Sequence, residues 1–241
     1  MTALRQCAVL AYHKVGAPSP GAWETWFYIP EQIFVEHLKC IHESGWTPID
    51  VGTFVAGLER PDSLPPRSVL ITFDDGYVSV LRVAMPLLAQ AGYPAAMFVP
   101  TQYIGTTNAF DEGNEPSEAI CSWEQLRRLD AGNISVESHG VSHTRLSALE
   151  GTEREDEFIA SKQALEKGLG KQVMLFSYPY GDSGSVPAAA AASLCSHGYR
   201  AAFLYGDGTA TIPTALPFLL PRIAMGPDTD LRNILKSASH P

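Results

Sequence analysis

Short apolar runs rich in alanine and β-branched residues alternate with longer amphipathic stretches along most of the 241-residue chain. Runs of the first kind indicate buried strands, and apolar residues at three- and four-residue intervals indicate helices. Strands are predicted at 8–12, 68–73, 95–99, 134–138, 173–177 and 201–204. Helices are predicted at 30–45, 53–58, 80–91, 122–129, 152–169, 186–196 and 231–237. Strand and helix therefore alternate about seven times, with no linker between them.

This alternation predicts parallel strands joined by right-handed crossover connections. Two architectures satisfy it, a closed or nearly closed barrel and an open doubly wound sheet. The sequence has neither a Gly-x-Gly-x-x-Gly fingerprint nor a phosphate-binding loop, which removes the commonest reason to choose the open sheet. We expect one α/β domain over residues 1–241, a length typical of a single barrel.

Composition and charge narrow the classes of partner. A hydrophobic fraction of 45% and a charged fraction of 18% are typical of a soluble globular protein. No apolar run approaches the about 20 residues of a membrane-spanning helix. The net charge of −9 argues against nucleic acid, because a phosphate backbone needs a basic face, so an uncharged substrate fits better.

The cysteines and the first residues bear on the compartment. Cys7, Cys40, Cys121 and Cys195 are widely spaced, which predicts free thiols rather than a thiolate metal site or a redox motif. The apolar stretch 7–12 is too short for a secretory signal. We expect a monomer in the cytoplasm by default. A chain trimmed of its signal would look the same, so the periplasm and the extracellular space stay open.

Polar residues stand where two predicted strands end. The strand 68–73 runs into Asp74, Asp75 and Gly76, and the strand 8–12 delivers His13. In parallel α/β folds the carboxyl ends of the strands face the ligand crevice, so these side chains are candidates for one site. The simpler alternatives are a surface turn for Asp-Asp-Gly and a satisfied core histidine for His13.

Two histidines follow a third predicted strand. His139 and His143 are four residues apart, and on a helical turn this spacing puts both imidazoles on one face. With one of the two aspartates they supply three ligands and leave positions open for water and substrate, as in a catalytic metal site. For the pair alone, ordinary polar residues are the alternative. Zinc is expected first, although cobalt, nickel and iron accept the same ligands.

An ion held in this way would lower the pKa of bound water towards about 7 and polarise a carbonyl oxygen, which makes amide or ester hydrolysis accessible. The reaction also needs a general base and a general acid. The aspartate that binds no metal is free to take a proton. His13 is the natural acid, because imidazole titrates near neutral pH.

Three motifs stand in order along the chain: Thr72-Phe73-Asp74-Asp75-Gly76-Tyr77, His139-x-x-x-His143 and Tyr178-Pro179-Tyr180-Gly181. In this order they resemble the polysaccharide deacetylase (NodB-homology) family, carbohydrate esterase family four. The resemblance runs from Tyr12 to about Ile223. It implies a distorted (β/α) barrel with about seven parallel strands and metal-dependent removal of N- or O-acetyl groups from sugars.

Carried over by position, the resemblance implies a role for each motif residue. Asp74 would be the base, and the metal ligands would be Asp75, His139 and His143. The backbone N–H of Tyr180 would help to bind the oxyanion, where negative charge develops. Tyr77, which ends the first motif, is a candidate substrate contact.

The sequence departs from the family pattern in two places. Ser177 stands where many members have an arginine that orients the base, and no Leu-x-His motif supplies an acid near the C-terminus. Both departures fit a permuted branch, because Tyr12-His13-Lys14-Val15 resembles the N-terminal Tyr-His-x-Val of the poly-N-acetylglucosamine deacetylases. In that branch the histidine acts as the acid. We hypothesise that Arg222 replaces the missing arginine beside Asp74.

The expected activity is removal of N-acetyl groups from a carbohydrate, with β-linked N-acetylglucosamine as the first candidate. The alternatives are hydrolysis of a non-sugar amide such as a cyclic ureide or imide, and an inactive carbohydrate-binding relative. A non-haem iron oxygenase uses the same ligands, but its usual His-x-Asp spacing is absent.

Trp123 is a candidate wall of the sugar site, with core packing as the alternative. Asp111 is expected to be a solvated loop charge.

Overall fold

The strands form one curled, mostly parallel sheet. The computed structural model describes residues 4–206 and 208–238. Across the sheet the strands follow the order β10 (Ala210–Ile212), β1 (Arg5–Tyr12), β5 (Arg67–Phe73), β6 (Ala95–Val99), β7 (Ile134–Ser138), β8 (Leu175–Ser177) and β9 (Ala201–Phe203). Two short strands extend it, as β4 (Thr47–Pro48) pairs with β5 and β11 (Ile223–Ala224) pairs with β1. Among the described strands of this sheet, only β10 is antiparallel to its neighbour.

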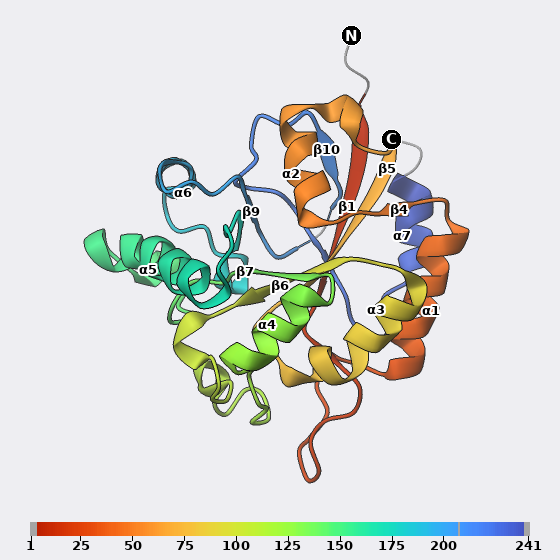
Figure 1. Ribbon diagram of the computed structural model, residues 1–241, viewed down its shortest axis with the longest axis horizontal. Helices are drawn as coiled ribbons and strands as arrows, with labels where there is room; N and C mark the ends of the chain where they lie inside the picture. Colours follow the sequence, from red (N-terminus) through yellow and green to blue (C-terminus); the bar gives the residue numbers. More distant parts are fainter. Residues whose placement is uncertain (1–3, 207, 239–241) are drawn as a thin grey trace.

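Helices surround the curled sheet (Figure 1). They are α1 (Glu31–Glu43), α2 (Val51–Glu59), α3 (Met85–Ala91), α4 (Trp123–Ala131), α5 (Gly151–Leu169), α6 (Pro187–Ser196) and α7 (Leu231–Ala238). A π-helical turn at Val80–Ala84 leads into α3. Short 3₁₀ turns lie at Pro61–Ser63, Thr101–Tyr103, Ala109–Asp111, Leu146–Ala148 and Pro179–Gly181. No helix in the described part of the chain is long and apolar enough to cross a bilayer.

The predicted α/β fold, a distorted (β/α) barrel in a single domain, is confirmed. Each predicted strand and helix is present within a few residues of its expected bounds. The sequence pattern missed β4, β10, β11 and the separate pair of β2 (Lys14–Val15) with β3 (Tyr28–Ile29). Two or three residues are too few to show a period, and β8 and β9, which are equally short, were found only because they lie in the apolar runs 173–177 and 201–204.

One segment connects the two edges of the parallel sheet. Leu220 pairs with β9, because its N–H donates to Ala202 O over 3.0 Å and its carbonyl accepts from Leu204 N over 2.9 Å. Three residues later the same segment becomes β11 and pairs with β1, with Ile223 opposite Leu10. Arg222 lies between these two pairings, so the chain carries its side chain across the gap between β9 and β1.

Apolar residues cover both faces of the sheet, as expected for parallel strands that helices enclose. Leu10 and Phe73 belong to the larger cluster, which packs against the outer helices. Val9 and Phe98 belong to a second cluster, which also contains Phe54 of α2. With both faces filled, the carboxyl ends of the strands are where polar side chains gather.

Helices α4 and α5 are in close contact at Trp123 and Gly168. A Cβ atom at Gly168 would lie 2.1 Å from Cζ3 of the Trp123 ring. The indole is partly buried and packs against the main core. Trp123 therefore has the packing role that was the alternative to a sugar contact.

Gly168→Ala should lower the free energy of unfolding by about 1–3 kcal/mol, because the added methyl group displaces the Trp123 ring. Urea unfolding at neutral pH measures the change. Gly52→Ala on α2 is the matched control, since the nearest atom to its Cβ is Asp50 Oδ1 at 3.4 Å. There we expect no loss of stability, because alanine favours the helix. Equal losses in both variants would contradict this account of the packing.

Candidate active site

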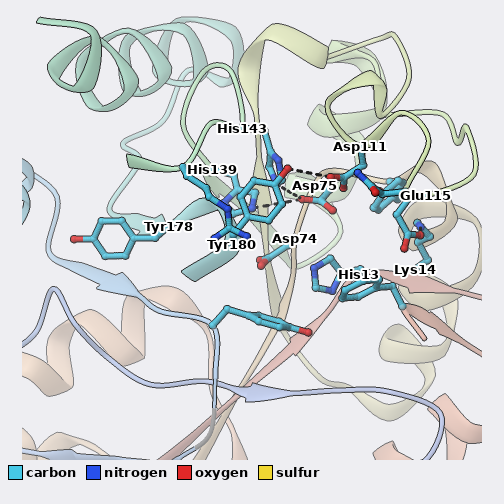
Figure 2. Close-up of a pocket in the computed structure, with 15 residues that line it drawn as sticks. His13, Lys14, Asp74, Asp75, Asp111, Glu115, His139, His143, Tyr178 and Tyr180 are labelled. Carbon is cyan, nitrogen blue, oxygen red and sulfur yellow. Dashed lines mark hydrogen bonds and ion pairs between the residues drawn. The ribbon is translucent and has the colours of Figure 1, made fainter. Parts of the chain in front are cut away.

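A pocket of about 380 Å³ opens at the carboxyl ends of the central strands (Figure 2). Seven residues from the predicted site line it: His13, Asp74, Asp75, Tyr77, His139, His143 and Tyr180. Arg222 is fully buried directly behind Asp74. The structure therefore brings together residues that are far apart in the sequence, as the strand-end argument predicted.

Asp75, His139 and His143 point toward one another in the pocket (Figure 2). Asp75 Oδ1 lies 3.4 Å from His139 Nε2 and 3.2 Å from His143 Nε2. Two ligands of a tetrahedral zinc ion with bonds of about 2.0–2.1 Å stand roughly 3.3 Å apart. All three side chains are buried, and Asp75 Oδ1 has no hydrogen-bond partner among the described residues. This donor set fits a divalent metal ion.

His139 is oriented by a hydrogen bond on its far side. Its Nδ1 lies 2.7 Å from the carbonyl oxygen of Ser177, which can only accept. The proton therefore sits on Nδ1, and in the neutral ring Nε2 keeps the lone pair that faces Asp75. This is the tautomer that a metal ligand needs.

His143 is held in a different way. Its Nδ1 has no hydrogen-bond partner among the described residues. Instead the imidazole lies between two aromatic rings, with centroid distances of 4.0 Å to Phe110 and 4.7 Å to Tyr180. Its backbone has a φ of 59°, in the left-handed region that residues with a side chain rarely adopt.

The turn after β5 explains how adjacent aspartates reach one pocket. Asp75 has a φ of 70° and Gly76 a φ of 80°, so the chain leaves the strand in a left-handed bend. A Cβ at Gly76 would lie only 3.1 Å from Val99 Cγ1. Glycine is therefore favoured there by its conformation, and a Cβ would force the Val99 side chain to shift.

Arg222 and Asp74 form a buried bidentate ion pair. Nη1 donates to Oδ1 over 2.8 Å, and Nη2 donates to Oδ2 over 2.7 Å. The remaining guanidinium hydrogens are donated to Leu204 O, Thr72 Oγ1 and Ser177 Oγ. These contacts use all five N–H groups of the guanidinium. The sequence hypothesis that Arg222 lies beside Asp74 agrees with this geometry.

The ion pair sets the charge state of Asp74. Burial alone would raise the pKa of this carboxyl group. The positive charge of Arg222 and its hydrogen bonds outweigh burial and hold the pKa of Asp74 below its usual range. Asp74 is therefore ionised at neutral pH.

His13 stands on the opposite side of the pocket from the paired histidines. Its ring contacts Phe27 at 4.6 Å and Tyr205 at 5.6 Å between centroids. Burial lowers the pKa of His13, although the carboxylates of Asp75 and Asp74 act in the other direction. The protonated ring, once formed, gives up its proton more readily than a free imidazole.

Tyr180 forms part of the outer wall. Its backbone is also left-handed, with a φ of 58°. The hydroxyl donates to Asp111 Oδ1 over 3.0 Å, and the guanidinium of Arg145 lies 4.3 Å from the ring centroid. Asp111 is thus a pocket residue, and the expectation that it is a solvated loop charge was wrong. Burial and the nearby Asp75 carboxylate raise its pKa.

Two more of the sequence expectations concern the walls. Tyr77 is buried and lines the pocket, whereas Trp123 is not among the residues that line it.

The sequence did not reveal the ion pair between Lys14 Nζ and Glu115 Oε2, which are 2.5 Å apart. It connects the segment that follows β1 with the loop that precedes α4. The two residues are 101 positions apart, and no local motif connects them.

The family model for polysaccharide deacetylases matches residues 62–202, which is more than half of the sequence. The chain belongs to the polysaccharide deacetylase family. Asp74, Asp75, His139, His143 and Tyr180 all lie within the matched range.

Known relatives of this chain differ in length. YxkH of Bacillus subtilis, named as a polysaccharide deacetylase, is 27% identical over 176 residues, which are 72% of this chain and 56% of that protein. The poly-β-1,6-N-acetyl-D-glucosamine N-deacetylase of Escherichia coli K12 is 24% identical over 109 residues, 43% of this chain and 16% of that enzyme. The chain thus spans about half of the first relative and a small part of the second.

A solved structure covers the chain more completely. IcaB from Ammonifex degensii superposes with a TM-score of 0.80 and is 25% identical, over 97% of each chain. The curled sheet and its helices are therefore the fold of this relative as well.

Arg222→Met should lower the free energy of unfolding by about 3–5 kcal/mol at neutral pH, because Asp74 would be left charged and buried without its partner. Arg222 holds the pKa of Asp74 down, so this stabilisation is present at neutral pH and is lost as the pH falls through the folded-state pKa. In the variant, burial raises that pKa and protonation relieves the penalty. The stability difference should therefore narrow from pH 7 towards pH 4.

Urea unfolding of both metal-free proteins across this pH range measures the difference. Arg200→Met is the control, because Arg200 pairs with Glu59 at the exposed surface. Surface pairs contribute at most about 1 kcal/mol. A difference between Arg222→Met and the parent that does not change with pH would contradict the ion-pair argument.

Proposed function

We propose that this chain is a metal-dependent hydrolase that removes N-acetyl groups from β-linked N-acetylglucosamine oligomers or polymers. The observation that carries the proposal is the pocket, in which a three-ligand group stands beside a separately held carboxylate and an imidazole. Family membership supports the reaction class, and the name of the Escherichia coli relative supports the sugar. We treat residues 1–241 as one deacetylase domain.

The ion would be held by Asp75, His139 and His143, with zinc preferred over cobalt, nickel or iron. When bound, it supplies two things that this chain lacks, a water of lowered pKa and an electrophile for the acetyl carbonyl oxygen. The fixed tautomer of His139 and the unpaired oxygen of Asp75 support this assignment.

Asp74 takes the proton of the attacking water. Its carboxylate is ionised at neutral pH and is held in one orientation by Arg222, so little reorganisation precedes proton transfer. Each oxygen accepts one hydrogen bond from Arg222 and keeps a further lone pair for the water.

The negative charge that develops on the acetyl oxygen is bound by the backbone N–H of Tyr180, and His13 then protonates the departing amine. His13 lines the same pocket as Asp74, so an acid and a base face one cavity. Tyr77 on the pocket wall contacts the sugar.

Asp74→Asn should reduce acetate release by at least about 100-fold while the bound metal stays at the parent level, because the amide cannot act as a base. His139→Ala should lose both activity and metal. Acetate release and elemental analysis of the purified proteins test these outcomes together. Full activity in Asp74→Asn, or metal-replete and active His139→Ala, would contradict the assignment.

The substrate is tested by comparing acetate release from β-1,6-linked N-acetylglucosamine oligomers and from chitin oligomers with ring opening of small cyclic amides. We expect release from the oligomers, its loss after chelation, and its recovery with zinc. A preference of about tenfold or more for the β-1,6 linkage would follow if the walls recognise the flanking sugar. Cyclic amide turnover without acetate release would contradict the proposal, and so would glycan binding by metal-loaded protein without release.

A further inference from the structure

The turn that carries the second histidine is fastened by a buried carboxylate from α5. Glu157 is only 6% exposed. It accepts hydrogen bonds from Val141 N over 2.6 Å, from Ser142 N over 3.1 Å and from Ser142 Oγ over 2.5 Å. Charge-assisted hydrogen bonds of this kind are roughly twice as strong as neutral ones. Three donors from two adjacent residues therefore converge on one side chain.

The donors lie between the two histidines of the motif. Glu157 thus binds the backbone immediately before His143, at the point where that residue enters its left-handed conformation. A turn in this conformation persists only when its surroundings hold it there. The carboxylate of Glu157 accepts from the two backbone N–H groups immediately before His143, whereas Gly140 N donates to Ser138 Oγ.

The glycine in the motif shows how closely the carboxylate approaches. Gly140 has a φ of 80°, and a Cβ built there would lie 2.5 Å from Glu157 Oε2. The absence of a side chain at this position leaves room for the carboxylate against the turn. Gly140 and Glu157 therefore form one packed unit.

The two imidazoles differ in their need for such support. His139 is fixed through its ring by Ser177 O, but the Nδ1 atom of His143 has no hydrogen-bond partner in the described part of the chain. Aromatic contacts restrict the tilt of the His143 ring without fixing its distance from Asp75. The position of the turn's backbone therefore determines the distance between the His143 ring and Asp75.

We propose that Glu157 is a positioning residue for the metal ligand His143, and that its carboxylate sets the affinity of the three-ligand group for a divalent ion. The inference rests on the proposed function, because it takes Asp75, His139 and His143 to be the ligands. Glu157 itself does not touch the reacting atoms. It acts through the turn that it binds.

The test is the affinity of Glu157→Gln for Zn²⁺ and Co²⁺, measured by competition with a chromophoric chelator. The oxygen of the amide can take the place of Oε2 and accept from both backbone N–H groups, but the NH₂ group then faces Ser142 Oγ and cannot accept from it. The variant therefore loses that bond and the negative charge that strengthens the other two. We expect the Kd to rise about 10- to 100-fold, as when a group that orients a metal ligand is lost. The visible spectrum of the Co²⁺ form should also change, because it reports the ligand geometry.

Glu166→Gln is the matched control. Glu166 lies on the same helix and also accepts from a backbone N–H, that of Val173 over 3.0 Å, but it does not contact the histidine turn. Its Kd and Co²⁺ spectrum should equal those of the parent. An equal loss of affinity in both variants would overturn the proposal, because it would show a general effect of removing a carboxylate from α5.

Ser142→Ala keeps the inference testable if Glu157→Gln does not fold. It removes one donor to Glu157 and leaves the two backbone donors, so we expect a smaller rise in Kd in the same direction. Parent-like affinity in a folded Glu157→Gln, or in Ser142→Ala when that variant is the only one available, would overturn the proposal. A parent protein that binds neither ion would instead overturn the proposed function.

Discussion

The buried ion pair of Arg222 and Asp74 is the interaction on which the arrangement of the pocket depends. Two charges removed from water lose several kcal/mol of hydration each, and their attraction compensates only when the geometry is good and every donor has an acceptor. Here the acceptors come from β5, from the end of β8 and from the residue after β9. The arginine itself comes from the segment that links β9 to β1. The pair is therefore stable only when the strands have assembled around it.

Ser177 connects this ion pair to the metal ligands. Its side chain accepts from Arg222 and its carbonyl accepts from His139, so one residue at the end of β8 contacts both the partner of Asp74 and an imidazole of the proposed metal site. It occupies the position at which the family resemblance predicts an arginine. The serine does not contact Asp74 itself, and its Oγ accepts from the guanidinium of Arg222, which enters from the segment between β9 and β1. The serine at the end of β8 is thus accompanied by Arg222, 45 positions later in the sequence.

The fold and most of the pocket could be predicted from the sequence for a physical reason. Long apolar runs define strands, parallel strands deliver their carboxyl ends to one edge, and Asp74, His13 and His139 all follow such runs. Side chains in long loops follow no such rule. The expectation for Asp111 was wrong, and the sequence left two roles open for Trp123, because tertiary contacts rather than local pattern decide whether a loop residue or a helix start faces the pocket. The contact between Lys14 and Glu115 had no sequence signal for the same reason.

Strain at the pocket shows how the surrounding structure supports it. Four non-glycine residues of the described chain have a positive φ, and three of them, Asp75, His143 and Tyr180, line the pocket. Each such conformation costs of the order of 1–3 kcal/mol, and it persists only when neighbouring contacts over-determine it. For Asp75 the following glycine and the strand hydrogen bond from Asp74 N to Tyr12 O fix the bend. For Tyr180 the conformation is fixed by the contact of its ring with Arg145 and by the hydrogen bond of its hydroxyl to Asp111. Because a regular strand would point adjacent side chains in opposite directions, these held bends are what allow neighbouring residues to face one cavity.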